Sequence, residues 1–516
     1  MLIDYLRAKI IKRNKSMLGK KKFEPKLIYN LTLDDLVSED NIYRQIDKFL
    51  DLRFVYKECK KLYGKTGKPS IDPVVFFKLE LFGYFENIIS DRELIKKAND
   101  SLAARYFIGY DLDEKLPWHS TISRTRALIS KEIFEKIFNR ILELCYQSGL
   151  IEGKHQSIDS TLVKANASLD SLEIKEPKLT AEEYINKTYE ENKTKEPQQK
   201  EDSCKEESEE KQSELRIEKS SENKTSKKTG SNKDYQSKTD PDSRLASKPG
   251  KPSRLYYSTH YSSDSKNRII TDVLTTYADK VDSTVLLEVY QRAEERLKNL
   301  GLTVQEVSAD KGYCSGKNLR EFEQREIKAF IPTQEYVNTN GNINNKEFRY
   351  DEEKDVFVCP NQKELSFYTY EKARQRNRYI GRKEECSKCP LKQQCCPEAK
   401  RRSVSRTIYY REYQRLEQRL KTPEAKRAYI IRKTVSEGLF AEAKMYHGLR
   451  KFMTRGVVKA QKRSYMIASV QNLKRLLGDI NRRIKKVHLI LKEILDTLFL
   501  FLKLNLAGLI LIERKI

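Results

Sequence analysis

The pattern of hydrophobic and polar positions predicts an all-α domain over residues 1–150, with few strand signals. Residues 71–85 carry an apolar stripe at helical spacing directly behind Asp72 and Pro73, a pair typical of a helix start. A second, shorter helix is predicted to begin at Asp91, whose side chain would cap it.

A third amphipathic pattern in this domain follows Trp118 and runs to about Gln147, where Gly149 is placed to end the helix. Its first turns hold Ser, Thr and the two arginines Arg124 and Arg126. Short helices followed by a helix of this composition suit a helix-turn-helix reader of DNA, with both arginines on phosphates. An ordinary helical bundle whose arginines are merely solvated is the alternative.

Beyond residue 150 the pattern alternates between strand and helix. Runs of β-branched and aromatic residues favour strands, and helical periodicity returns between them. This alternation indicates an α/β sheet. We expect strands at residues 156–163, 255–261, 269–276 and 304–309, helices at 281–300 and 318–326, and long helices from about 411 onward.

Two stretches interrupt the α/β pattern. Residues 172–251 are rich in Glu, Lys, Ser, Gln and Asn, and burial cannot offset the entropy of ordering them, so they predict a disordered, low-complexity insertion. A small, β-rich insertion that carries cysteines follows at residues 348–400. The remaining segments are the α/β core at 151–171, 252–347 and 401–485, and an apolar tail at 486–516.

The charge balance points to a polyanionic partner. Lys and Arg total 101 against 75 Asp and Glu, which gives a formal net charge of +26. Nucleic acid is the usual partner of such a chain, although a basic balance also suits a membrane surface or simple solubility. Nine cysteines, an odd number, and a first segment too polar to form the core of a signal peptide favour a reducing cytoplasm.

Three carboxylates are candidates for phosphodiester chemistry. Asp159 lies in a predicted strand, and Asp310 follows another strand with a glycine turn behind it. Glu437 lies on a predicted helix, with Lys444 two turns further along nearly the same face. Hard divalent cations prefer oxygen ligands, and two ions held by three carboxylates can activate an attacking oxygen and stabilise a leaving one. Taken singly, each acid has the alternative of being an ordinary surface residue, since most carboxylates are exposed. It is the sequence contexts that single the three out together.

The contexts of these acids resemble those of a known family. Residues 158–167, around Asp159, resemble the first-aspartate segment of bacterial insertion-sequence transposases of the DDE superfamily, and residues 309–313 resemble the second. The helix around Glu437 resembles the Tyr-x2-Arg-x3-Glu-x6-Lys signature of one group, and residues 469–475 resemble the segment after it. The resemblance spans nearly the whole chain except the low-complexity insertion and the apolar tail.

This resemblance implies a ribonuclease H-like mixed sheet flanked by helices, in which Asp159, Asp310 and Glu437 bind two Mg²⁺ or Mn²⁺ ions. It implies that water attacks DNA at the element ends and that the freed 3′-hydroxyl then attacks target DNA. The expected partners are double-stranded DNA and a second copy in a synaptic homodimer, at the nucleoid of a bacterial cytoplasm, with no small-molecule substrate. A catalytically inactive, DNA-binding remnant of a transposase is the alternative, because the insertion and the tail are unusual.

The chain departs from the signature at one point. Four residues separate Arg432 from Glu437 where the signature has three, so Lys433 stands at the family spacing. Either Arg432 or Lys433 is expected to neutralise a DNA phosphate. Lys444 keeps the family spacing and is expected to bind phosphate as well.

Five thiols fall in the β-rich insertion, where a close Cys-x2-Cys pair is joined by further cysteines. This grouping suits a structural, tetrahedral zinc site in a section with little core, and free or buried thiols are the alternative. The expected ligands are Cys359, Cys386, Cys389 and Cys395, with Cys396 left over.

The apolar tail raises the question of a membrane. Residues 494–512 include Asp496, Lys503 and Asn505, and Gly508 interrupts them, so they would make a poor spanning helix. We expect a packed or partner-binding helix and no membrane partner. A basic protein anchored in a membrane by this segment is the weaker alternative.

Overall fold

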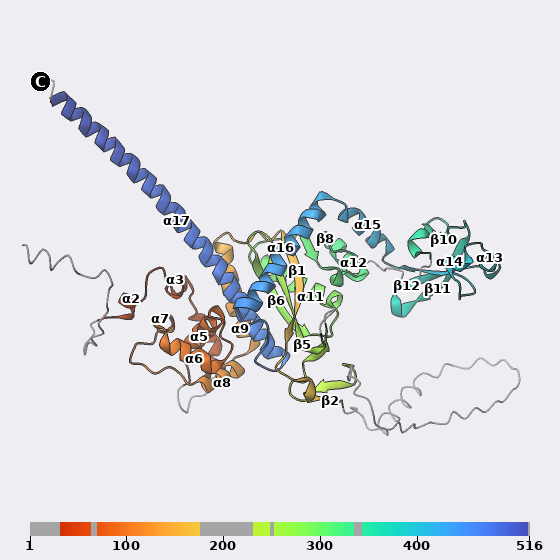
Figure 1. The fold of residues 1–516 in the computed structure, drawn as a ribbon, viewed down its shortest axis with the longest axis horizontal. Helices are drawn as coiled ribbons and strands as arrows, with labels where there is room; N and C mark the ends of the chain where they lie inside the picture. The colour runs from red at the N-terminus through yellow and green to blue at the C-terminus, as the bar shows by residue number, and fades with distance from the viewer. Residues whose placement is uncertain (1–30, 63–69, 176–230, 248–251, 335–342, 514–516) are drawn as a thin grey trace, which may run out of the picture.

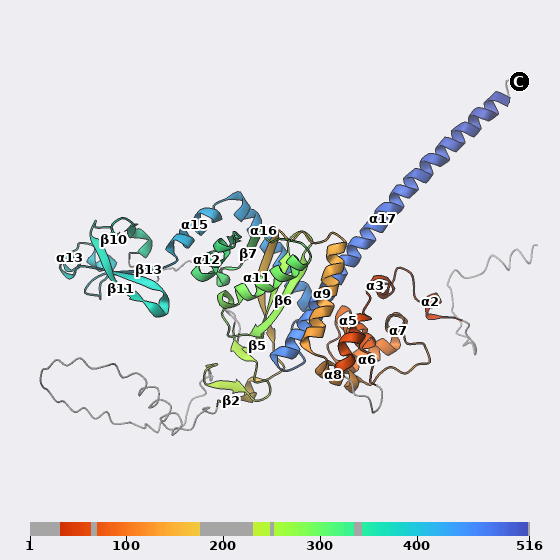
Figure 2. The same cartoon turned by 180° about the vertical axis from the view of Figure 1, so that it is seen from behind.

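The computed structural model describes residues 31–62, 70–175, 231–247, 252–334 and 343–513, with side chains up to residue 499. Within these residues the chain forms a helical N-terminal region, a mixed α/β region, a small antiparallel sheet and one long C-terminal helix (Figure 1). The N-terminal helices and the small sheet lie on opposite sides of the mixed α/β region (Figures 1 and 2).

The N-terminal region is helical, as predicted. Its elements are α2 (Leu33–Leu36), α3 (Ile42–Phe49), α4 (Phe54–Cys59), α5 (Pro73–Phe85), α6 (Asp91–Asp100), α7 (Leu102–Ile108), α8 (His119–Leu128) and α9 (Lys131–Gln147). Asp72 caps α5 by accepting hydrogen bonds from two backbone N–H groups, which confirms the predicted helix start. The predicted cap of α6 is wrong, because Ser90 holds the N-cap position and Asp91 forms an ion pair with Arg126.

The central sheet is mixed. Its strands are β1 (His155–Lys164), β4 (Arg244–Ala246), β5 (Arg254–Asp264), β6 (Ile269–Tyr277), β7 (Glu306–Ala309) and β8 (Lys328–Phe330). β5 pairs antiparallel with β1 on one side and with β6 and β4 on the other, whereas β7 runs parallel to β1 and β8 parallel to β7. The helices α11 (Asp282–Asn299) and α12 (Gly316–Gln324) follow β6 and β7 in the chain. The predicted α/β class is therefore confirmed.

The low-complexity insertion is ordered at its two ends. β2 (Leu172–Ile174) pairs with β3 (Tyr235–Ser237), and β4 joins the central sheet. Asp240 is fully buried and accepts a hydrogen bond of 2.6 Å from the hydroxyl of Tyr257 in β5, which fastens this segment to the core. The prediction of disorder is therefore wrong for residues 172–175 and 231–247, while residues 176–230 and 248–251 lie outside the described residues.

The β-rich insertion is a second sheet of five antiparallel strands. These are β9 (Arg349–Asp351), β10 (Val356–Val358), β11 (Glu364–Glu371), β12 (Arg376–Gly381) and β13 (Ser403–Thr407), with the short helices α13 (Lys383–Ser387) and α14 (Lys392–Cys395) between β12 and β13. β13 extends this unit past the boundary at residue 400 that the sequence predicts, because it pairs along β12.

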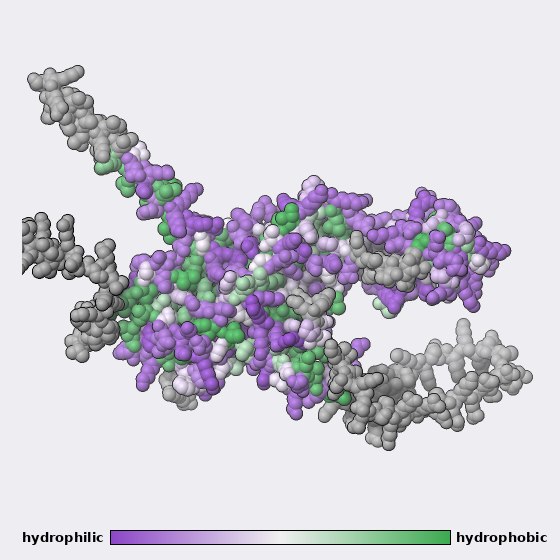
Figure 3. Space-filling model, in the orientation of Figure 1, coloured by the Kyte–Doolittle hydropathy of each residue, from purple (hydrophilic) through white to green (hydrophobic). Residues whose placement is uncertain are grey.

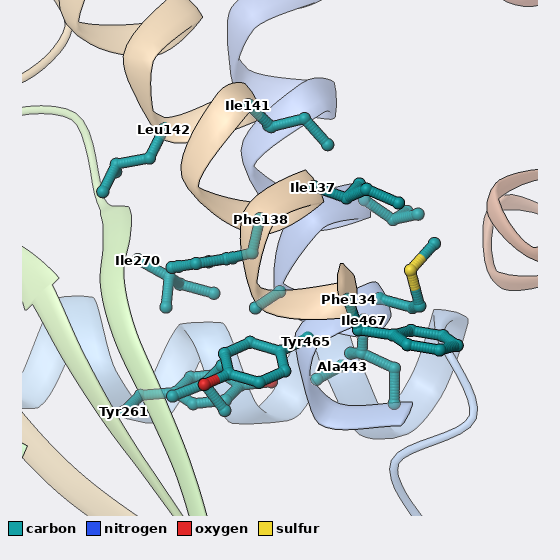
Figure 4. Close-up of a cluster of buried hydrophobic side chains, with 14 of the residues drawn as sticks. Phe134, Ile137, Phe138, Ile141, Leu142, Tyr261, Ile270, Ala443, Tyr465 and Ile467 are labelled. Atoms are coloured by element: carbon teal, nitrogen blue, oxygen red, sulfur yellow. The ribbon is translucent and has the colours of Figure 1, made fainter. Parts of the chain in front are cut away.

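Three helices complete the chain: α15 (Tyr410–Leu420), α16 (Pro423–Tyr446) and α17 (Val457–Glu513). The first part of α17 packs on α9 and β6, and Figure 4 shows Phe138 of α9 beside Tyr465 of α17, with ring centroids 5.8 Å apart. The side chains of Gln461 and Asn472 bond to backbone groups of β6, including Thr275 N and Ile270 N. The helix thus covers an edge of the sheet whose backbone groups would otherwise be open to another strand.

Candidate active site

Two of the three predicted acids lie side by side where the parallel pairing of β1 with β7 ends, Asp159 within β1 and Asp310 directly after β7. The register of β1 with β7 ends at the pair Ile158 and Ala309. The next residue on each strand is an aspartate, Asp159 and Asp310. Because adjacent strands lie about 5 Å apart, the register brings these two carboxylates close together.

The third predicted acid lies across from them on α16. Glu437 lines the same cleft as Asp159 and Asp310, a cleft of about 900 Å³. The preceding residue, Ser436, is buried and shares a hydrogen bond of 2.9 Å with Ser157 of β1, which fixes this turn of α16 against the sheet. The fold therefore brings three residues, more than a hundred positions apart in the sequence, to one cleft.

The basic residues predicted on α16 differ in where they lie. Arg432 lines the cleft, and its Nη2 is 3.9 Å from Oδ1 of Asp310. Lys433 is exposed and is not part of the cleft wall. Lys444 lines the cleft and donates a hydrogen bond to the hydroxyl of Thr161 on β1. Of the two alternatives for phosphate contact, Arg432 is thus the one that faces the acids.

Two further carboxylates, Asp279 and Asp282, line this cleft and escaped the sequence reasoning, and Asp282 is the one that contacts the segment of Asp159. It is the first residue of α11, and its Oδ1 accepts a hydrogen bond of 3.3 Å from the hydroxyl of Ser160, beside Asp159. A Cβ at Gly312, two residues beyond Asp310, would lie 3.2 Å from Oδ2 of Asp282, so the backbone here passes very close to this carboxylate. The sequence holds one signal for it, a helix that opens with an acid soon after a strand end.

The electrostatics of the cleft favour a bound cation. The pKa of Asp159 is raised to about 6, mainly by burial and to a smaller extent by the nearby Asp310 and Asp282, while the backbone N–H of Ser160 and the charge of Arg432 act against this rise. Such a shift reports a carboxylate that lacks sufficient positive charge nearby. Aspartate and glutamate oxygens are the ligands that Mg²⁺ and Mn²⁺ prefer, so the donor set fits these ions. In the part of the chain that the structure describes, no three His, Cys, Asp or Glu side chains already surround one point that would hold a metal ion.

Two buried histidines, His260 and His447, form hydrogen bonds to other groups inside the protein. His260 bonds through Nδ1 to the Tyr313 hydroxyl at 2.8 Å and through Nε2 to Thr276 at 3.2 Å, and burial lowers its pKa to about 3. His447 bonds through Nδ1 to the backbone oxygen of Tyr84 at 2.8 Å. These contacts agree with leaving both residues out of the catalytic set.

The two arginines predicted to contact DNA on α8 lie in different environments. Arg126 is buried and forms ion pairs with Glu80 and Asp91, so its guanidinium holds α5, α6 and α8 together. The prediction that Arg126 contacts DNA is wrong, because its positive charge is already satisfied inside the helical region. Arg124 is exposed and its guanidinium donates to Ser120 of its own helix, so its role on DNA stays a prediction.

The thiols of the second sheet meet around one small pocket, and none of them forms a disulfide. The backbone N–H of Lys363 donates to Cys359 Sγ at 3.3 Å, and the side-chain amide of Asn361 donates to Cys389 Sγ at 3.5 Å. Sulfur atoms that accept such bonds suit thiolate ligands of zinc. Among the described residues, however, no three of these side chains already surround one point that could hold a metal ion, and bound zinc stays a prediction. The pocket contains the four expected ligands Cys359, Cys386, Cys389 and Cys395, and also Cys396.

Comparison with known families matches two parts of the chain. A model described as a transposase domain (DUF772) matches residues 31–128, and a model described as a transposase DDE domain matches residues 358–477. The second match includes Glu437 but neither Asp159 nor Asp310. Both matches are to transposase domains, and together they support the resemblance to DDE transposases of insertion sequences. No curated protein matches the chain.

Among the helices of the described residues, none combines the length and the apolar character that crossing a membrane requires.

Proposed function

We propose that this protein cuts DNA at the ends of an insertion element and joins the freed ends to target DNA, with Asp159, Asp310 and Glu437 as its catalytic carboxylates. The observation that carries the proposal is that these acids, from β1, the residue after β7, and α16, line one cleft. We further propose that the central sheet, with three antiparallel strands followed by two parallel ones and helices around it, is a ribonuclease H-like core.

Two Mg²⁺ or Mn²⁺ ions bound by these carboxylates would activate the attacking oxygen and stabilise the leaving oxygen of an in-line displacement. The chain's own residues position the DNA for this chemistry. Arg432 holds a positive charge beside Asp310, where it can neutralise a phosphate oxygen, and Lys444 does the same at the other end of α16's exposed face. Asp282 adds negative charge at the cleft wall and orients Ser160 next to Asp159.

Double-stranded DNA is the proposed partner. The net charge of +26 supplies the attraction to phosphates that DNA binding requires, and the N-terminal transposase domain presents the exposed Arg124. We propose that two copies hold two element ends together in a synaptic homodimer, on bacterial DNA in the cytoplasm. Strand joining needs two ends in one complex, which is the reason for this stoichiometry.

The substitution Asp310→Asn tests the proposal, because it removes one carboxylate charge and keeps the size of the side chain. We expect Mg²⁺-dependent cleavage of DNA from the ends of the gene's own locus to fall by at least about 10³-fold, since removing a metal ligand removes most of the stabilisation of the transition state. Binding of the same DNA, measured by fluorescence anisotropy, should stay within about threefold, since DNA affinity comes mainly from phosphate contacts.

Asp234→Asn is the matched control, because Asp234 is exposed and lies outside the cleft. It should cut DNA at the unaltered rate. Unchanged cleavage by the Asp310 variant would refute the assignment. A chain that binds end DNA in a salt-sensitive way but never cuts it would be the inactive remnant. Retention of all three acids around one cleft does not favour that alternative.

A further inference from the structure

The long helix α17 has two halves with opposite surroundings. Its first half, up to Leu477, is buried between α9, α5 and β6. Residues 482–498 are exposed at every position, and the helix extends away from the rest of the described chain as a single straight rod (Figures 1 and 2). A helix that leaves the body of a protein in this way gains no support from that body.

The exposed half is nevertheless apolar along one face. Ile484, Val487, Leu491, Ile494 and Leu498 are between 49% and 60% exposed, and apolar and polar residues alternate in patches along the rod (Figure 3). Isolated helices of this kind are marginal in water, because most helix stability in proteins comes from packing an apolar face. The exposed face therefore requires a partner.

The spacing of this face identifies the kind of partner. From Ile480 the apolar residues follow at alternating intervals of four and three, at 484, 487, 491, 494 and 498. An average repeat of 3.5 residues is the a/d pattern of helices that wind around one another.

We propose that residues 480–498 of α17 pair with the same segment of a second copy of this chain in a coiled coil. The charged residues Lys485, Lys486, Lys492, Glu493 and Asp496 lie mainly on the opposite face and stay in water when the apolar faces meet. The buried half of the same helix anchors each coil to its own catalytic region through Gln461 and Asn472. The coil therefore connects two catalytic regions through continuous helices.

Association through this segment does not depend on the proposed catalysis and is measured without DNA. Leu489 and Leu491 provide a matched pair for the test, because they are 58% and 52% exposed and lie about 200° apart around the helix. Leu491→Asp places a charge in the a/d face, and Leu489→Asp places the same charge on the polar face. Neither side chain supports the fold of a single copy.

The measurement is the molar mass of the purified full chain by sedimentation equilibrium across a range of concentrations. We expect the unaltered chain and Leu489→Asp to be dimers or larger assemblies, because Leu at a with Ile and Val at d also suits bundles of more than two helices. Leu491→Asp should weaken the association at least about 100-fold, and any loss of helical circular dichroism should be no larger than the exposed half of α17 accounts for. The method reports both the mass and the association constant.

Two results would overturn the proposal. One is an unaltered chain that stays monomeric at all concentrations. The other is equal association of the two variants, which would place the interface elsewhere. A chain that is monomeric in solution yet sediments with vesicles of phosphatidylcholine and phosphatidylglycerol, and loses this binding in Leu491→Asp, would assign the apolar face to a lipid surface and refute the coiled coil.

Discussion

The two sheets of this protein differ in how much apolar surface supports them. The central sheet belongs to a large continuous core that includes α9, α11, α16 and α17. Among the described residues, the second sheet has a separate core cluster of five buried apolar side chains: Phe348, Phe357, Leu365, Tyr379 and Val404. Its strand β11 also leaves the aromatic rings of Phe367, Tyr368 and Tyr370 exposed.

The comparison teaches that core size decides what other chemistry a sheet needs. A small core rarely contributes more than about 3–5 kcal/mol, so small units commonly carry a metal or disulfides. The second sheet gathers five thiols beside its core. The central sheet needs no such support, and it holds costly carboxylates at its edge instead.

Loss of the thiol site should unfold the second sheet alone, and this is the largest effect that we expect. Cys389→Ser removes one of the four predicted zinc ligands, and structural zinc contributes folding free energy directly. Bound zinc, measured by mass spectrometry of the metal content of reduced protein, should fall from about one ion per chain to background. Amide hydrogens of residues 349–407 should then exchange rapidly, while those of β1 and β5 stay protected.

Cys396→Ser is the matched control, because Cys396 is the thiol left over from the predicted ligand set and should leave the zinc content unchanged. If freshly reduced, unaltered protein contains no zinc, the view that a metal supports the second sheet is wrong. The five side chains of the small core would then have to stabilise the second sheet without it.

The stability of the central sheet should depend strongly on its buried ion pairs. Asp272 of β6 is fully buried and pairs with Arg292 and Arg296 of α11. Asp272→Ala leaves these guanidinium groups without their main partner, so we expect the free energy of unfolding to fall by about 3–5 kcal/mol. Urea denaturation followed by circular dichroism measures this loss.

Asp279→Ala removes a partly exposed aspartate whose ion pair with Arg244 is 3.4 Å long, and should cost under about 1 kcal/mol. Equal losses in the two variants would contradict the view that burial makes the Asp272 cluster essential to the central sheet.

The rate of DNA cleavage at the acid edge of the central sheet, where Asp159 and Asp310 lie side by side, should depend on Arg432 and not on Lys433. Arg432→Ala removes the guanidinium that lies 3.9 Å from the Asp310 carboxylate, and we expect DNA cleavage to fall about 10²-fold, which corresponds to about 2.7 kcal/mol. Lys433→Ala should change the rate less than about threefold, because this side chain points to solvent. A larger loss with Lys433→Ala would restore the family spacing as the better guide.

The sequence predicts those parts of the fold whose signals are local. β5, β6 and α11 lie within a few residues of their predicted bounds, because strand and helix periods are written in consecutive residues. The prediction of a single helix from Trp118 to Gln147 is wrong, because the chain breaks it into α8 and α9. Its apolar pattern continues across Ile129, although Ser130 is a residue typical of helix starts.

What the sequence could not predict depends on contacts between distant residues. Burial of Arg126 follows from Glu80 and Asp91, which no local pattern connects to it. Asp282 belongs to no motif and gains its place only because α11 begins at the acid edge. The three predicted acids were found through local motifs, whereas the cleft that gathers them comes from the parallel register of β1 with β7.

The smallest expected effect is a gain in stability from removing a catalytic acid. The pKa of Asp159 is about 6 in the folded chain, above its ordinary value near 3.8, so the folded state binds this proton more tightly than the unfolded state does. The charged form therefore destabilises the fold at pH values above about 6, and the penalty disappears as the pH falls below about 4. Asp159→Asn removes the charge but keeps a buried polar amide, so only part of this penalty is regained, and without divalent ions we expect a stabilisation of about 1 kcal/mol at pH 7.

The same variant separates function from stability when Mg²⁺ is added. Mg²⁺ should raise the melting temperature of the unaltered chain, because an ion that binds only the folded state stabilises it, and should leave that of Asp159→Asn nearly unchanged. Asp234→Asn, an exposed control, should respond to Mg²⁺ as the unaltered chain does. If Asp159→Asn proves less stable than the unaltered chain in the absence of metal, the charge of Asp159 does not destabilise the fold. The contrast between a sheet that tolerates unfavourable carboxylates and one that relies on its thiols would then lose its basis.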